Sequence, residues 1–263
     1  MTHPAGGAVP GQRYRMTVAY DGAAYSGWQI QPSRETIQGE LERVLFELTR
    51  RRERIHCSGR TDTGVHARGQ VVHFNLVTPV EPRKLRLGFN ALLPADIRVL
   101  AVRKAAADFH ARKSAVGKEY RYFIWNGDVL PPFLRNHRAH VRDRLDVAAM
   151  NRAARHLVGR QDFAAFSANP HREINGTVRH LWDLRVRRSG REVIIVARGD
   201  GFLYKMVRSL AGFLIRVGAG EVDPGAAAVI LGSKVRTARV PTAPGCGLFL
   251  WRVYYDPRAA PGP

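Results

Sequence analysis

Residues 54–75 read RIHCSGRTDTGVHARGQVVHFN. The stretches 54–58 and 70–75 carry apolar residues between turn-forming ones and predict two short strands. The loop between them combines polar side chains with glycines, which permit unusual backbone angles and the close approach of a substrate. The segment therefore predicts a strand–loop–strand unit, and the other elements can be placed around it.

The elements on either side of this unit complete a regular order in the first half. A strand at 14–20 ends at the Asp21-Gly22 turn signal, and a helix at 36–51 has apolar side chains at 3.6-residue spacing. A second helix at 82–92 ends before Pro94, and a strand at 97–104 follows it. The first half therefore reads β-α-β-β-α-β, the order of a ferredoxin-like domain.

The second half repeats this order at greater length. Its expected elements are a strand at 115–125, a loop at 130–144, a helix at 147–158, a hairpin of strands at 177–187 and 192–198, a helix at 201–217 capped by Asp200, a short helix opened by Pro224 and a strand at 248–254. We expect an α+β fold of two ferredoxin-like domains, 13–108 and 109–256, between a flexible tail at 1–12 and a tail at 257–263.

The charge of the chain indicates a polyanionic partner. Its 42 Lys and Arg residues against 22 Asp and Glu residues give a net charge of +20 and a pI of about 11.1. Nucleic acid is the simplest such partner. A membrane surface is the competitor, but the cations are spread along the chain and no apolar run is long enough to cross a membrane. The excess of Arg over Lys suits bidentate phosphate contacts, although a coding bias would give the same composition.

The cysteines and the first residues indicate the compartment. Cys57 and Cys246 form no CxxC pair, and two cysteines do not make a disulfide framework. The first twelve residues lack the charged start and apolar core of a signal peptide. We therefore expect a cytoplasmic protein.

Asp62 is the candidate catalytic residue of the loop, with Arg60 two positions before it. In an extended stretch the two side chains share a face, and a nearby cation favours the ionised carboxylate, which can act as a nucleophile or a base. Two other interpretations of this segment remain open. The Arg–Asp pair can simply brace the loop. A metal could be held by His56, Cys57, His66 and His73, although their spacing fits no standard zinc pattern.

Two further segments place cations beside aromatic or apolar residues. In 109–123, FHARKSAVGKEYRYF, they alternate on an expected strand that has Tyr120 and Tyr122 on one face. Such a strand can stack an unpaired base, or can form an aromatic face of the core. In 199–212, GDGFLYKMVRSLAG, Lys205 and Arg208 are three apart, and they can hold a phosphate or a carboxylate or form a solvated basic face.

Taken in order, these segments resemble the tRNA pseudouridine synthase A family. The resemblance covers most of the chain, and its most specific part is the GRTD of residues 59–62. The matching stretches are AYDG (19–22), GWQ (27–29), GRTDTGVHA (59–67), DFHAR (108–112), YRY (120–122), DF (162–163), FLYKMVR (202–208) and GLFL (247–250). Thr63 and Phe249 stand where Ala and Tyr are more usual in the family, and neither change touches a group that the chemistry needs.

The resemblance implies a fold and an activity. The fold is two ferredoxin-like domains whose antiparallel sheets join across a basic, RNA-sized cleft. The activity is the isomerisation of uridine to pseudouridine at positions 38, 39 and 40 in the anticodon stem-loop, by a homodimer in which one tRNA contacts both subunits. It implies no cofactor and no metal, because the composition of the nucleoside does not change. The sequence also has no Walker or dinucleotide fingerprint.

The same resemblance assigns roles to five residues. Asp62 is the catalytic carboxylate, which either attacks C1′ of the ribose or removes the C2′ proton. Tyr120 stacks on the uracil and helps to remove the C5 proton. Arg208 pairs with Asp62, and Arg60 orients that carboxylate or fills the gap left by the target nucleotide. Leu248 packs beside the base and excludes water.

Other functions agree with parts of this pattern. A non-catalytic RNA-binding protein on the same fold would explain the charge and the aromatic residues without Asp62. A pseudouridine synthase with a different RNA target would share the GRTD segment. A hydrolase that uses Asp62 lacks a second carboxylate at a recognisable site.

Overall fold

The computed structural model describes residues 11–169 and 176–259. Its strands are β1 (Gln12–Tyr20), β2 (His56–Cys57), β3 (His66–Leu76), β4 (Ile97–Ala105), β5 (Gly117–Asn126), β6 (Ala139–Val141), β7 (Gly159–Asp162), β8 (Val178–Ser189), β9 (Glu192–Gly199) and β10 (Leu248–Tyr254). Its α-helices are α1 (Ile37–Thr49), α2 (Pro82–Leu92), α3 (Val147–Arg155), α4 (Met206–Gly218) and α5 (Ala226–Ser233).

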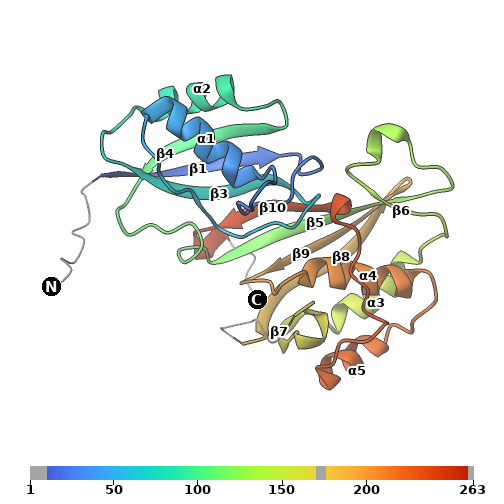
Figure 1. Ribbon diagram of the computed structural model, residues 1–263. Coiled ribbons are helices and arrows are strands. Elements are labelled where there is room, and N and C mark those ends of the chain that lie inside the picture. The colour runs from blue at the N-terminus through green and yellow to red at the C-terminus, as the bar shows by residue number, and fades with distance from the viewer. Residues whose placement is uncertain (1–10, 170–175, 260–263) are drawn as a thin grey trace.

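All these strands belong to one sheet. Its main path runs β4-β1-β3-β10-β5-β9-β8-β7, with β2 paired to β3 and β6 paired to β5. Figure 1 shows the sheet crossing the molecule, with α1 and α2 beside the strands of the first half and α3, α4 and α5 beside those of the second. The fold is therefore mixed α+β with a mostly antiparallel sheet, and at this level the sequence prediction is confirmed.

The two halves of the sheet have the same internal order. In the first half the neighbours run β4-β1-β3-β2, and in the second β10-β5-β9-β8, and every pairing along these two paths is antiparallel. The short strand β6 lies outside them and pairs in parallel with β5. The halves meet where β3 pairs in parallel with β10, through His66 with Phe249 and Ala67 with Leu250. The end of the polar loop that contains Asp62 therefore lies at this junction.

Local sequence explains where the helices of the first half begin and end. The side chain of Thr36 accepts a hydrogen bond from the Gly39 backbone at the start of α1, and Arg50 ends that helix in the left-handed conformation. Glu81 caps α2 in the same way, with Pro82 as its first residue. In β1 every second residue is buried, as expected for a strand covered on one face.

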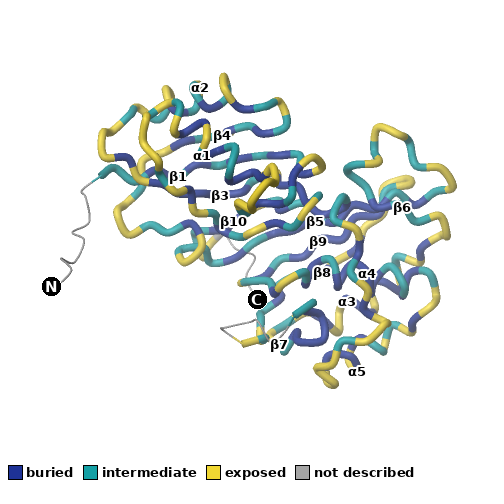
Figure 2. Tube along the Cα trace, in the orientation of Figure 1, coloured by how far each residue is buried: buried dark blue, intermediate teal, exposed yellow. Residues whose placement is uncertain are grey.

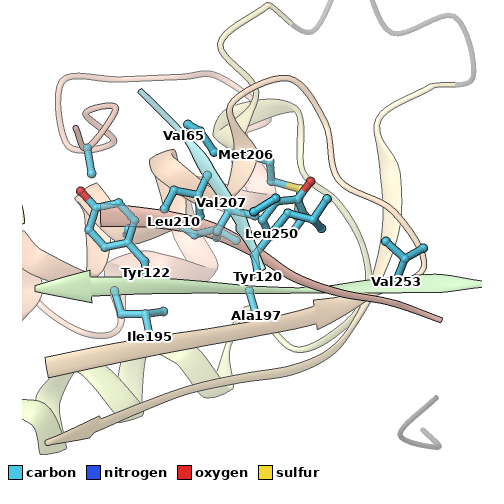
Figure 3. Close-up of a cluster of buried hydrophobic side chains, with 14 of the residues drawn as sticks. Val65, Tyr120, Tyr122, Ile195, Ala197, Met206, Val207, Leu210, Leu250 and Val253 are labelled. Carbon is cyan, nitrogen blue, oxygen red and sulfur yellow. The ribbon is translucent and has the colours of Figure 1, made fainter. Parts of the chain in front are cut away.

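The core follows the middle of the sheet, where Figure 2 shows buried chain along β1, β3, β5 and β9. Figure 3 shows Tyr120 and Tyr122 of β5 on the same side of the sheet as Met206, Val207 and Leu210 of α4. On the opposite face of the sheet a smaller cluster contains Phe123, Ile194 and Val196, packed by Phe249 and Trp251. Alternation along the strands separates these two faces.

Several boundaries differ from the sequence predictions. The strand expected at 70–75 begins earlier, at His66, because Ala67 pairs with both Tyr20 and Leu250. The strands β6 and β7 were not predicted, since three and four residues give little periodicity. Gln12, expected in the first tail, is the first residue of β1, whereas residues 1–10 lie outside the described part of the chain.

The expected capping of α4 by Asp200 is wrong. The helix begins at Met206, after Lys205 in the left-handed conformation, and has no side-chain cap. Asp200 Oδ1 instead accepts a 3.0 Å hydrogen bond from the backbone of His180 and so joins the ends of β8 and β9. Residues 201–205 lead into α4 without helical structure and end in a turn at Tyr204 and Lys205. The first turn of the helix then reaches the loop that contains Asp62 through Arg208.

Candidate active site

The loop between β2 and β3 is fixed by hydrogen bonds from buried neighbours. Ser58 donates from Oγ to Gln70 at 2.8 Å, and Gln70 in turn donates from Nε2 to the Gly59 carbonyl at 2.7 Å. The hydroxyl groups of Tyr20 and Thr61 lie 2.9 Å apart. Because these groups come from β1 and β3, the loop that presents Asp62 is attached to the centre of the sheet.

Gly27 packs closely against the backbone of this loop at Thr61. Its φ is +85°, in the region that favours glycine, and a Cβ atom there would lie 2.6 Å from the Thr61 carbonyl oxygen. The next residue, Trp28, is buried and donates its backbone N–H to the same carbonyl at 3.0 Å. The GWQ stretch is thus in direct contact with the residue before Asp62.

Asp62 is paired with Arg208 of α4. Nη1 of Arg208 donates a 2.8 Å hydrogen bond to Oδ2 of Asp62, and Nε donates to the Ala243 carbonyl at 2.8 Å. The side chains of Asp62 and Arg208 are 27% and 15% exposed, so the pair is partly shielded but reachable from solvent. The free oxygen of the carboxylate is available to a substrate.

A pocket of about 1040 Å³ opens over this pair. Asp62 is the one carboxylate among its lining residues, whereas six cations line it: Arg54, Arg60, Arg112, Lys118, Lys205 and Arg208. The lining comes from both halves of the chain, including the start of α1, the loop of Asp62, β5 and the start of α4. A pocket with this charge balance suits a polyanion that delivers an uncharged group to a carboxylate.

Tyr120 and Leu248 form the apolar part of the pocket. Tyr120 is 8% exposed, and its ring lies edge-on to that of Phe202 at 5.1 Å between centroids. Burial raises the pKa of Tyr120 above its ordinary range, so the phenol carries its proton at neutral pH. Leu248 is 6% exposed and begins β10, opposite Tyr122. A flat apolar surface therefore lies beside the carboxylate.

The structure brings four of the five expected site residues into this arrangement as the sequence suggested. Asp62, Tyr120, Arg208 and Leu248 line one pocket. The expected contact of Arg60 with Asp62 is not formed: Arg60 lines the pocket but is exposed, and its guanidinium has no hydrogen bond or ion pair with the residues that the structure describes. The carboxylate turns instead toward Arg208, which reaches it from α4. The ammonium group of Lys205 lies over the ring of Tyr204, 5.0 Å from its centroid.

The histidines considered as metal ligands lie in two places. His56 stacks on His73 with 4.9 Å between ring centroids, whereas His66 lies with Asp21 and His137. This last group is the one set of three possible ligands in residues 11–169 and 176–259, with ligand atoms within 4.8 Å of one another. Its atoms are already engaged within the protein, since His66 Nδ1 accepts from Gly22 at 3.0 Å and His137 Nε2 lies 2.7 Å from Asp21 Oδ2.

Comparison with known proteins shows the family of the chain. A family model described as tRNA pseudouridine synthase matches residues 16–112 and 153–256, which include Asp62, Arg208 and Leu248. The chain belongs to this family. The resemblance found in the sequence is thereby confirmed, and the enzyme class that goes with the family is that of the isomerases.

Curated members of the synthase family are similar over nearly the whole chain. The tRNA pseudouridine synthase A of Halalkalibacterium halodurans is 46% identical over 242 residues, covering 92% of this chain and 92% of that protein. The enzyme of the same name from Bacillus subtilis is 42% identical over 246 residues, covering 93% and 99%. The one from Brevibacillus brevis is 43% identical over 245 residues, covering 93% and 100%.

Sequence reasoning missed the residues that hold the site of this synthase in place. Tyr20, Thr61 and Gln70 hold the loop of Asp62 in place, and of these three only Gln70 lies outside the family stretches found in the sequence. Gly27, like Tyr20 and Thr61, could have been found, because it is part of a family stretch, GWQ. Lys118 lies in a stretch that the sequence marked as basic and aromatic, yet nothing distinguished it from the neighbouring cations.

Proposed function

We propose that this chain isomerises uridine to pseudouridine at positions 38, 39 and 40 in the anticodon stem-loop of tRNA, with Asp62 as the catalytic carboxylate. The observation that carries the proposal is the position of Asp62, the one carboxylate lining a basic pocket, held by Arg208 beside the ring of Tyr120. The reaction that belongs to the family requires a carboxylate beside a flat apolar surface for the base.

The reaction breaks the N1–C1′ bond of the uridine, turns the uracil and joins C5 to C1′. Asp62 starts it in one of two ways. As a nucleophile it attacks C1′ and forms a covalent bond to the ribose, and as a base it removes the C2′ proton and produces a glycal. In either case Arg208 holds one carboxylate oxygen and leaves the other for the reacting atom.

The apolar residues hold the base while it turns. The ring of Tyr120 stacks on the uracil, and Leu248 packs against its edge and excludes water. Because burial favours the protonated phenol, Tyr120 serves first as a stacking surface. It accepts the C5 proton only at the end of the reaction, in concert with the loss of its own proton to solvent or to Asp62.

A paired uridine must leave its helix to reach Asp62, at a cost of a few kcal/mol of unstacking. The net charge of +20 supplies phosphate contacts that offset this cost. Arg60 is exposed at the mouth of the pocket and has no partner among the described residues, which suits it to fill the gap left by the flipped nucleotide. This is the second of the two roles expected for Arg60.

The proposal extends to the architecture. The matching strand orders β4-β1-β3-β2 and β10-β5-β9-β8 support two ferredoxin-like domains, residues 13–108 and 109–256. We further propose a homodimer in which one tRNA contacts both subunits, located in the cytoplasm; the two free cysteines suit a reducing compartment. Within the described residues, no helix is both long and apolar enough to cross a bilayer.

Mapping of the product tests the target directly. Unmodified tRNA transcripts are incubated with the protein, and pseudouridine is located by chemical labelling and primer extension. The proposal expects pseudouridine at positions 38 to 40 and at no other uridine. Modification only outside the anticodon arm would indicate a different RNA target. Tight, salt-sensitive binding without any product would indicate a non-catalytic RNA-binding protein.

A further inference from the structure

Lys118 faces the catalytic loop from β5. It stands two residues before Tyr120, so both side chains lie on the same face of the strand, and both line the pocket. A Cβ atom at Gly59 would lie 3.4 Å from Lys118 Cε and 3.8 Å from the Tyr120 hydroxyl oxygen. The ammonium group is therefore next to the loop of Asp62.

The ammonium group of Lys118 has no partner in the part of the chain that the structure describes. Among the described residues no hydrogen bond or ion pair reaches its Nζ, whereas Arg208 in the same pocket is engaged by Asp62 and Ala243. A half-buried ammonium group without a partner loses hydration, and no hydrogen bond or ion pair with the described residues compensates for that loss. Such a group is retained at little cost only if a ligand supplies the missing acceptor.

The surroundings of Lys118 select an anion as that ligand. Burial, with smaller contributions from Arg112 and Arg179, lowers the pKa of Lys118 to about 8, against the opposite effects of Cys57 and Asp200. The ammonium is still charged at neutral pH. An amine has three donors and no acceptor, so an oxyanion is the partner that satisfies it.

We infer that Lys118, together with Arg112, binds a phosphodiester group that flanks the target uridine. The inference rests on the proposed function, since it takes the ribose at Asp62 as its reference point. When C1′ lies at Asp62 and the uracil at Tyr120, the flanking phosphates lie beyond the sugar, and Lys118, Arg112 and His110 line the same pocket as cationic or polar partners for them. Phosphate contacts set the register of a nucleic acid on a protein, so this subsite positions the ribose for the reaction.

The competing role for Lys118 is mechanical. Its aliphatic stem packs near Gly59 and could simply brace the loop. Lys118→Met keeps the stem and removes the charge, so it separates the two roles. Lys118→Arg keeps the charge and is expected to restore most of the lost activity. Lys104→Met is the matched control, because Lys104 is exposed on the edge strand β4 and does not line the pocket.

The experiment replaces the phosphate as well as the lysine. Anticodon stem-loops are made with one uncharged methylphosphonate linkage, either 5′ or 3′ of the target uridine, and turnover is compared with that of the natural stem-loop. We expect Lys118→Met to lower kcat/KM about 10- to 100-fold, and one of the two linkages to cause a similar loss with the natural protein. The two changes together should cost no more than either alone, because they remove the same contact.

The inference would be overturned if the losses from the lysine and linkage changes were additive. It would also be overturned if the natural protein turned over both methylphosphonate stem-loops as fast as the natural stem-loop, and this result does not depend on how well the variant folds. A second readout does not depend on turnover. The slope of log affinity for whole tRNA against log salt should become shallower by about 0.7 to 0.9 in Lys118→Met and stay unchanged in Lys104→Met. If the natural protein fails to turn over any anticodon-arm uridine, the proposed function fails, and an unchanged slope would separately reject the phosphate subsite.

Discussion

Arg208 and Asp62 are 146 positions apart in the sequence and joined by a 2.8 Å hydrogen bond between Nη1 and Oδ2. The contact links the first turn of α4 to the loop between β2 and β3, and so ties the two halves of the chain at the pocket. Because Nε of the same guanidinium is held by the Ala243 carbonyl at 2.8 Å, its direction is fixed before any substrate arrives. The carboxylate is therefore oriented by the second half of the fold.

Turnover should require both hydrogen bonds of the Arg208 guanidinium, from Nη1 to Asp62 and from Nε to the Ala243 carbonyl. Lysine has a single ammonium group and cannot span both the Asp62 carboxylate and the Ala243 carbonyl. We expect Arg208→Lys to lower kcat about 10- to 100-fold, which corresponds to the loss of one charged hydrogen bond of roughly 1.5–3 kcal/mol. Single-turnover tritium release measures this. Arg216→Lys in the same helix, where the arginine pairs with Glu221 near the surface, is the control and should be silent. Equal activity of Arg208→Lys and the natural protein would show that these two simultaneous hydrogen bonds are dispensable.

Gly27 offers a test of the support behind the catalytic loop. Alanine at φ +85° costs about 1–2 kcal/mol for the backbone alone, and its Cβ would meet the Thr61 carbonyl oxygen at 2.6 Å. We expect Gly27→Ala to lower the Tm by at least a few degrees and to reduce turnover more than tRNA affinity. Calorimetry and single-turnover kinetics check the two effects.

The control for this substitution lies in α5. At Gly232 no atom lies within 4 Å of an added Cβ, and the residue is helical, so Gly232→Ala should leave the Tm unchanged or raise it. Its activity should match that of the natural protein. If Gly27→Ala were as active and as stable as this control, the close approach of Gly27 to Thr61 would be unnecessary for stability and turnover.

Glu119 is expected to make stability depend on pH. It is 2% exposed, and although burial opposes it, hydrogen bonds from Arg121, Tyr254 and Arg198 lower its pKa below the ordinary value of 4.5. Because the pKa is lowered in the folded state, this stabilisation is complete above pH 4.5 and is lost as the pH falls through the folded-state value. We expect Glu119→Gln to reduce the free energy of unfolding by about 3 kcal/mol at pH 7.

Urea unfolding at several pH values measures this effect. The difference between Glu119→Gln and the natural protein should shrink as the pH falls below 4.5, where the carboxyl of the unfolded chain is protonated, and should reach its minimum once the folded-state carboxyl is neutral as well. Glu35→Gln, at an exposed position, should differ little from the natural protein at any pH. A difference that is constant from pH 7 to the acid limit would mean that charge plays no part in the role of Glu119.

Local patterns in the sequence predicted the regular elements well. Helix α2 and strand β10 have the predicted bounds, because a proline start and an apolar run are signals that need no tertiary context. The short strands β6 and β7 depend on pairing with distant partners and could not be predicted locally. The parallel junction of β3 with β10 likewise has no signature in either strand alone.

The candidate site likewise has a part that local sequence indicates and a part that depends on distant contacts. Asp62 was identified from its own segment, but its ion-pair partner could not be found from neighbours in the sequence. Spacing favoured Arg60, two positions away, whereas the structure places Arg208 there and leaves Arg60 at the mouth of the pocket. The family resemblance named Arg208, because it compares positions across the whole chain. Contacts of long sequence separation become visible only through such comparison or through the fold.

The most direct test of the account is tritium release from tRNA labelled at uracil C5, with the natural protein and with Asp62→Asn. The substitution keeps the size of the side chain and an oxygen that can accept from Arg208, but removes the nucleophile or base. The account predicts release by the natural protein and a loss of roughly 10⁴-fold or more in the variant, with tRNA affinity nearly unchanged. Release by Asp62→Asn at a rate close to that of the natural protein, in a variant with unaltered thermal unfolding, would contradict it.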